Sequence, residues 1–243
     1  MGTITMFASG KDGVGKSTLA VFVGAALAMG NEKTLIIELD NGFRSIDVIS
    51  GTYGKLIYDI NDVLTGKVEP QRAIIKSPIS ENLFVMSAPY SSSQLHIEDF
   101  VRLTTSLSEE YEHVIIDTAA TAGAIFSAAS CAMRAILITT ADPVNVRNSK
   151  IISDRLIHEY SINNTRLIIN RVNISHVQAG IVPNLDFVID SIGAQLIGVV
   201  PETLDIALAS SGIRAINDGS PSMRIFMNIA ARMNGDDIPL LVR

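Results

Sequence analysis

Two kinds of segment alternate along most of the chain. Short apolar runs predict strands, and several of these runs are continuous, as in strands buried on both faces of a parallel sheet. The predicted strands are Thr3–Ala8, Thr34–Leu39, Leu83–Ser87, His113–Asp117, Ala135–Thr140, Arg166–Arg171 and Gln195–Val200. Helical periodicity between them predicts helices at Ser17–Met29, Leu95–Ser108, Ala122–Cys131, Val144–Tyr160, Leu185–Ile192, Glu202–Ser210 and Ser222–Met233.

This alternation predicts an α/β fold with a doubly wound, mostly parallel sheet flanked by helices. No internal repeat, low-complexity tract or linker separates the segments. We therefore expect residues 1–243 to form a single domain, with residues 235–243 as a candidate tail. In such sheets ligands bind outside the carboxyl ends of the strands, so candidate chemical residues are sought there.

Composition narrows the class of protein. The chain has 243 residues, 47% of them hydrophobic, and a formal net charge of −6, which argues against a generally basic nucleic-acid binder. Its one cysteine, Cys131, cannot form a disulfide within the chain, as suits a reducing compartment. No signal peptide is evident after Met1, and the apolar run Ala20–Met29 is about half the ~20 residues of a membrane span. We therefore expect a cytoplasmic protein.

The most specific motif follows the first predicted strand and reads S-G-K-D-G-V-G-K-S-T from Ser9 to Thr18. It matches the phosphate-binding pattern G-x-x-x-x-G-K-[ST], in which glycines let the backbone approach phosphate and a helix follows. Lys16 would reach the β- and γ-phosphates, and the Ser17 hydroxyl would bind Mg²⁺. A glycine-rich turn with a solvated lysine is the alternative. The predicted nucleotide contacts here are Gly10, Lys11, Gly13, Val14, Gly15, Lys16, Ser17 and Thr18.

A second lysine, Lys11, follows the first glycine, and with it the loop resembles that of the deviant Walker A ATPases, K-G-G-V-G-K-[ST]. The resemblance implies that Lys11 reaches the phosphates of a partner subunit across a nucleotide-bound dimer. Asp12 departs from the pattern, which has glycine there. Because its carboxylate would repel phosphate, we expect it to point away, toward the dimer face or solvent, and Asp12→Gly to leave ATP affinity nearly unchanged.

The second predicted strand leads into E-L-D-N-G-F-R-S-I-D, in which Asp40 stands at the carboxyl end. Asp-Asn-Gly is also a turn signal, and spacing alone would favour a capping aspartate. The segment resembles the first switch of MinD-type ATPases, which has the form D-x-D-x-G-L-R-N-L-D. Gly42, Arg44 and Asp47 match this form, and Glu38 stands where the family has another acidic residue, aspartate. That resemblance implies that Asp40 positions the attacking water.

A later strand ends in V-I-I-D at Asp117, the form of a Walker B motif, whose carboxylate holds Mg²⁺ opposite Ser17. A helix N-cap is the alternative role, since small residues follow. The resemblance makes residues 118–121 the second switch. The family's proline is missing from this segment, so we expect a more flexible switch and an altered coupling of hydrolysis to partners.

Two further strand ends carry residues that are candidates for contact with the adenine base of the nucleotide. The resemblance implies that Asn170 and Arg171, in I-N-R-V, frame adenine, although a turn asparagine is the plainer explanation of Asn170 alone. Val200, Pro201 and Glu202 would lie near the base through backbone contacts. The histidines show no metal-ligand spacing. The Ser91–Ser93 run has no general base near it in the sequence, so a loop is a better explanation of it than a catalytic nucleophile.

The resemblance runs from Thr3 to about Val242, and the MinD-like branch fits best. It implies a slowly hydrolysing ATPase that binds ATP or ADP with Mg²⁺, switches as a nucleotide-dependent homodimer in spatial regulation of cell division, and answers to an activator protein. Members of that branch end in a basic amphipathic helix that inserts into lipid. Here Ser222–Met233 carries few cations and residues 236–239 hold two acids and a proline, so we expect a last core helix and at most weak peripheral membrane contact.

Parts of the sequence are also compatible with other functions. A ParA-like partition ATPase would need a basic surface for DNA, for which Arg147, Arg155, Arg166 and Arg214 are scattered candidates and the acidic total is unfavourable. A flagellar-placement regulator would share the same core. A metal-cluster carrier or nitrogenase-type reductase needs two cysteines per subunit, and this chain has one. A binding module without turnover is the remaining alternative.

Overall fold

One eight-stranded sheet forms the centre of the computed structural model, which describes residues 1–39, 44–89, 95–213, 216 and 218–240. The strands are β1 (Thr3–Ala8), β2 (Thr34–Glu38), β3 (Ile75–Lys76), β4 (Leu83–Met86), β5 (His113–Asp117), β6 (Arg134–Thr139), β7 (Thr165–Val172) and β8 (Gln195–Pro201). Their order is β3-β4-β2-β5-β1-β6-β7-β8, and every pairing is parallel except β3 with β4.

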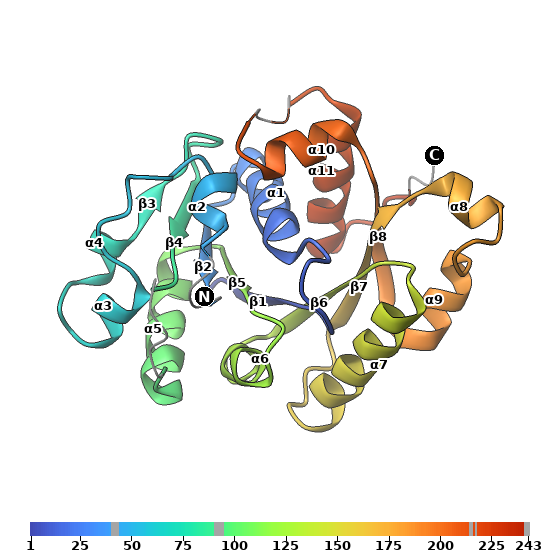
Figure 1. Cartoon of the computed structure of the whole chain (residues 1–243). Helices are drawn as coiled ribbons and strands as arrows, with labels where there is room; N and C mark the ends of the chain where they lie inside the picture. Colours follow the sequence, from blue (N-terminus) through green and yellow to red (C-terminus); the bar gives the residue numbers. More distant parts are fainter. Residues whose placement is uncertain (40–43, 90–94, 214–215, 217, 241–243) are drawn as a thin grey trace.

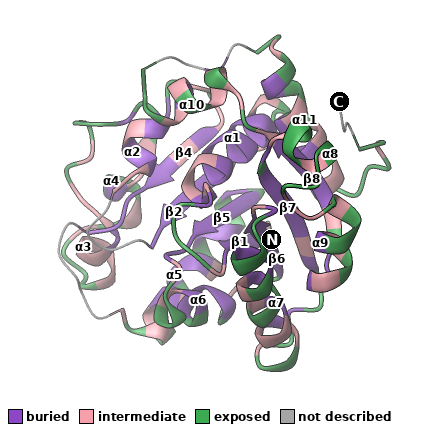
Figure 2. Ribbon diagram, turned by 45° about the vertical axis from the view of Figure 1, so that its right-hand side comes forward, coloured by how far each residue is buried: buried purple, intermediate pink, exposed green. Residues whose placement is uncertain are grey.

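Helices cover both faces of the sheet (Figures 1 and 2). One face carries α1 (Lys16–Met29), α2 (Ile46–Ile49), α10 (Leu204–Ser210) and α11 (Pro221–Met233). The other carries α3 (Ile60–Leu64), α4 (Pro70–Ala73), α5 (Ile97–Glu110), α6 (Ala122–Ala129), α7 (Pro143–His158) and α9 (Leu185–Ile192). The short α8 (Ile174–Gln178) follows β7.

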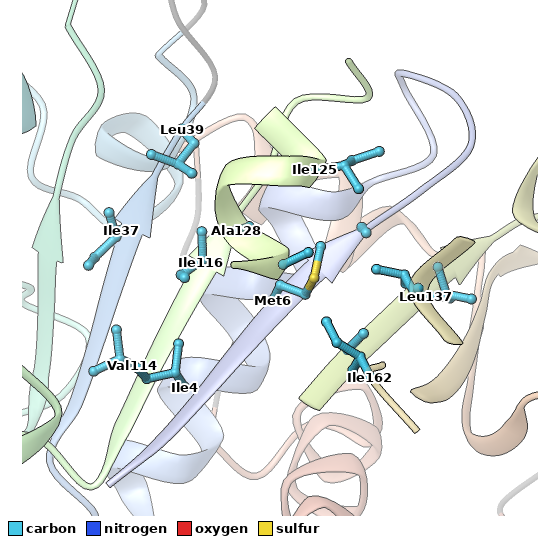
Figure 3. Close-up of a cluster of buried hydrophobic side chains, with 14 of the residues drawn as sticks. Ile4, Met6, Ile37, Leu39, Val114, Ile116, Ile125, Ala128, Leu137 and Ile162 are labelled. Atoms are coloured by element: carbon cyan, nitrogen blue, oxygen red, sulfur yellow. The ribbon is translucent and has the colours of Figure 1, made fainter. Parts of the chain in front are cut away.

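Each central strand contributes side chains to two separate cores. In β1, Ile4 and Met6 enter the core under α5 and α6, whereas Phe7 enters the core under α1. Figure 3 shows the first of these cores, where Met6 lies among residues of the neighbouring strands and Ile125 of α6. Because both faces are covered, these strands read as continuous apolar runs in the sequence.

The predicted α/β class with a mostly parallel sheet is confirmed, and the seven predicted strands and seven predicted helices all occur, with ends shifted by at most two residues. The prediction missed α2, α3, α4, β3 and α8. Each of these has two to five residues, too few for a periodic pattern to emerge.

The last long helix, α11, packs on the body of the protein, as predicted. Phe226 is fully buried, and its ring lies 5.3 Å from that of Phe22 in α1. The segment after α11 is held by Arg232, whose guanidinium donates to the carbonyls of Ile238 (2.9 Å) and Ile197 (2.8 Å) and also to that of Pro239. Among the described residues, no helix is both long and apolar enough to span a bilayer.

The packing of α11 predicts an unequal effect for two neighbouring apolar residues. Phe226→Ala should lower the free energy of unfolding by about 3–4 kcal/mol, because it removes a buried ring and leaves a cavity. Met227→Ala is the matched control, since this side chain is 44% exposed and should cost less than about 1 kcal/mol. Urea unfolding of both variants measures the difference, and equal losses would contradict a packing role for Phe226.

Candidate nucleotide site

The loop predicted to bind phosphate joins β1 to α1 at the carboxyl edge of the sheet. Gly13 (φ 78°) and Gly15 (φ 97°) both adopt left-handed backbone angles, which explains why glycine stands at these two positions. Gly15 is the N-cap of α1 and has no side chain to occupy the free N–H groups of the first turn. The local sequence thus leaves backbone N–H groups at the start of a helix without a side-chain cap, an arrangement that suits an anion.

Two asparagines support this loop from other elements. Asn148 of α7 donates to the carbonyl of Gly10 (3.3 Å), and Asn170 of β7 donates to that of Val14 (2.7 Å). A Cβ at Gly10 would lie 2.5 Å from Asn148, and one at Gly15 would lie 2.4 Å from the amide nitrogen of Asn170. The sequence offered no signal for Asn148, which stands within an ordinary helical pattern.

The placement of Asn170 differs from the one that the resemblance implies. Its side chain is buried, and its amide nitrogen is bonded to the loop backbone. That nitrogen thus has a structural partner, and its predicted role in framing adenine stays a prediction. Arg171 next to it is exposed and has a left-handed φ of 53°, at an irregularity in the pairing of β7 with β8.

Lys16 and Asp12 form an ion pair within the loop. The Nζ of Lys16 lies 3.5 Å from Oδ1 of Asp12, and the lysine side chain is only 7% exposed. The same oxygen accepts a hydrogen bond from the backbone N–H of Ala120 (3.3 Å). The Asp12 side chain is 76% exposed, in line with the expectation that it faces the dimer face or solvent, but one of its oxygens also lies beside the phosphate-binding lysine, which that expectation did not include. Lys11, by contrast, is exposed, and its role toward a partner subunit stays a prediction.

Asp117 ends β5 directly beside the loop. In the sheet register it pairs with Phe7 of β1 on one side and Glu38 of β2 on the other. Thr118 donates its hydroxyl to the carbonyl of Phe7 (2.9 Å), and the N–H of Leu39 donates to the carbonyl of Asp117 (2.8 Å). These bonds hold the buried Asp117 at the same edge as Ser17, the first-turn residue predicted to share a metal with it.

Glu38 is a second buried carboxyl group at this edge. Its Oε1 accepts hydrogen bonds from the N–H groups of Ser45 (2.8 Å) and Ile46 (3.2 Å), at the start of α2. Burial raises the pKa of Glu38 to about 7, and the backbone hydrogen bonds oppose that shift. Glu38 therefore connects the strand end to the segment that follows Asp40.

Asp40 itself, the residue predicted to position water, lies outside the described residues. Two further residues of the predicted first switch are described. Arg44 donates to the carbonyl of Ala88 (2.5 Å) and to Asp59 (3.2 Å), and Asp47 is buried in α2. This segment is thus fastened to the neighbouring loops on the carboxyl-terminal side of Asp40.

The ends of β7 and β8 lie together, as predicted. Val172 pairs with Pro201, and the N–H of Glu202 donates to the carbonyl of Val172 (3.2 Å). Arg171 and Glu202 contribute to a hollow of about 160 Å³ that also reaches Thr140 at the end of β6. Of the candidate residues for the base, Arg171 and Glu202 thus line one hollow at the ends of β7 and β8, whereas Asn170, Val200 and Pro201 are not among its lining residues.

The buried Glu38 predicts a pH dependence of stability. Between about pH 4.5 and pH 7 the folded protein retains a proton on Glu38 that the unfolded chain has lost, so the free energy of unfolding falls as the pH rises. Glu38→Gln stays neutral and should lack this dependence. In metal-free buffer, the stability of the parent relative to the variant should fall by about 1–3 kcal/mol from pH 5 to pH 8.

Urea unfolding at both pH values measures this difference. Glu109→Gln, at an exposed position of α5, is the control and should show no such change. A Glu38→Gln effect of equal size at pH 5 and pH 8 would contradict the buried-proton interpretation.

Comparison with known proteins agrees with this geometry. Residues 5–214 match the model of the CobQ/CobB/MinD/ParA nucleotide-binding domain, and the chain belongs to that family. Within it, the chain is one of the MinD-like ATPases of cell division. The septum site-determining protein MinD of Thermotoga maritima is 30% identical over 250 residues, which cover 99% of this chain and 91% of that protein.

Solved structures give the same result. The MinC:MinD cell division protein complex of Aquifex aeolicus superposes with a TM-score of 0.91 and 26% identity, covering 98% of both chains. The MinD of Pyrococcus horikoshii, solved as a complex with Mg-ADP, shares the fold with a TM-score of 0.83 and 21% identity over 96% of both chains. The resemblance inferred from the loop motifs is thus confirmed for the whole chain.

Proposed function

We propose that the chain binds ATP at the loop between β1 and α1, closes into a homodimer while ATP is bound, and reopens after hydrolysis. The observation that carries this proposal is the buried Lys16 at the amino end of α1, directly after two left-handed glycines. Free N–H groups and a lysine cation in a concavity suit the charge and shape of a polyphosphate.

The oxygen donors at the sheet edge fit a Mg²⁺ ion. Ser17 and Asp117 supply a hydroxyl and a carboxylate, and Mg²⁺ commonly takes one or two protein ligands, with phosphate and water completing its octahedron. In the part of the chain that the structure describes, no three His, Cys, Asp or Glu side chains gather as a metal site of their own. When bound, the ion would offset the charge of the phosphates.

The remaining residues have distinct proposed roles. Asp40 orients the attacking water and accepts its proton, and Lys11 completes the site of the partner subunit. The ends of β7 and β8 hold the base through Asn170, Arg171 and Pro201. Gly10, Gly13, Val14, Gly15 and Thr18 complete the set of proposed contacts with the nucleotide. The whole chain would act as one domain.

The switch would act on a protein partner in the cytoplasm. The related Aquifex protein is a complex of MinC with MinD, so we infer that a protein of that kind is the effector of this chain. The packing of α11 and the clamp on residues 238–239 argue that membrane contact is weak and peripheral, because the apolar face of this helix is already covered.

Substitutions of the two loop lysines should have different effects. Lys16→Ala should weaken ATP and ADP binding by about 10- to 100-fold, since it removes a buried charged donor to phosphate. Lys11→Ala should bind nucleotide normally and fail to dimerise with ATP. Calorimetry measures affinity, and light scattering measures dimerisation. Equal nucleotide affinity of Lys16→Ala and the parent would overturn the proposed site.

Asp40→Ala should trap the ATP-bound dimer and lower the hydrolysis rate at least a hundredfold, as expected for a residue that activates water. A variant that hydrolyses ATP at the parental rate would disprove this role. The trapped dimer also identifies the working surface, through sedimentation with ATP or ADP in the presence of anionic liposomes or of DNA.

We expect little pelleting with either liposomes or DNA, and recovery of the dimer only with the protein effector. Strong ATP-dependent pelleting with liposomes would instead show autonomous membrane binding. Salt-sensitive pelleting with DNA would place the protein with the partition ATPases.

A further inference from the structure

A single oxygen atom of Asp12 contacts two parts of the site. Oδ1 lies 3.5 Å from the Nζ of Lys16 and 3.3 Å from the backbone nitrogen of Ala120. Lys16 begins α1, whereas Ala120 lies three residues after Asp117, at the approach to α6. Asp12 thus joins the phosphate-binding loop to the segment that follows the carboxylate proposed to bind metal.

The backbone on both sides of Asp12 is fixed. The carbonyl of Lys11 accepts a hydrogen bond from the hydroxyl of the buried Ser9 (2.6 Å), and Gly13 takes its left-handed conformation directly after Asp12. On the other side, both the N–H and the hydroxyl of Thr118 are bonded to Phe7. The contact therefore joins two anchored segments across a short distance.

The chemistry of the contact resembles that of the proposed ligand. A carboxylate oxygen beside the ammonium of Lys16 presents the same charge and the same kind of acceptor as a phosphate oxygen. Both anions cannot share one lysine without repelling each other. A phosphate that binds Lys16 therefore favours displacement of the carboxylate through this repulsion, and a chain with glycine at this position could not form the contact at all.

We propose that Asp12 is a positioning residue that acts as the internal counter-anion of Lys16 when no nucleotide is bound, and that it releases Ala120 when a phosphate takes its place. Nucleotide occupancy is thereby transmitted to residues 118–121. This inference rests on the proposed nucleotide site, and it replaces the expectation that Asp12→Gly leaves affinity unchanged.

Two substitutions separate the two contacts of Asp12. Asp12→Asn removes the charge but keeps an oxygen that accepts from Ala120, whereas Asp12→Gly removes both contacts. Because the carboxylate is exposed, the ion pair should affect affinity by no more than about fivefold. We expect both variants to bind ADP two- to fivefold more tightly than the parent at low salt, with the gain shrinking at 0.5 M salt as charges are screened.

Hydrogen exchange of the Ala120 amide, measured by NMR without nucleotide, tests the second contact. Exchange should be several-fold faster in Asp12→Gly than in the parent, and close to parental in Asp12→Asn. Asp190→Asn, at an exposed position in the last part of α9, removes an equal charge as the matched control and should change neither readout.

The outcomes that overturn the inference are distinct. ADP affinity within twofold of the parent in both variants, or an equal gain in Asp190→Asn, would refute the counter-anion. Parental exchange at Ala120 in Asp12→Gly would refute the tether. A parent protein that binds no ADP would refute the proposed nucleotide site and with it the counter-anion, while the exchange experiment would still decide the contact with Ala120.

Discussion

The parallel pairing of β1 with both β5 and β6 is the constraint on which the rest of the molecule depends. Since all three strands run in one direction, the loop after β1 and the carboxylate that ends β5 emerge at the same edge. Helices must then cover both faces, which produces the two cores and the continuous apolar strands. The site is a consequence of this strand order, and the core residues hold it in place.

The strong signals in the sequence were those with a local physical cause. The glycines at 13 and 15 stand where the backbone is left-handed, and the buried strands are long enough to be recognised by apolar character alone. These features can be predicted because each depends on only a few neighbouring residues. Short elements such as α3 and β3 depend on tertiary contacts, so no local stretch of sequence shows a pattern that predicts them.

Long-range contacts account for what the sequence did not reveal about the site. Asn148 lies 138 residues from the glycine carbonyl that it supports, and Asp12 meets an amide 108 residues away. Repulsion between a carboxylate and phosphate was a sound argument about Asp12 with nucleotide present. It left out the lysine that needs a counter-charge in the absence of nucleotide. The sequence likewise could not predict that Glu38 and Asp117 are partners in the neighbouring strands β2 and β5, because that depends on the register of the sheet.

The clamp made by Arg232 also bears on the exposed edge of the sheet. β8 is the last strand of the sheet, and Ile197 lies at an irregularity in its pairing with β7. A bare strand edge is a template for pairing with another chain. Arg232 occupies the carbonyl of Ile197 and holds residues 238–239 nearby. The guanidinium therefore makes the edge strand β8 less available for pairing with a strand of another chain, the contact with which aggregation can begin.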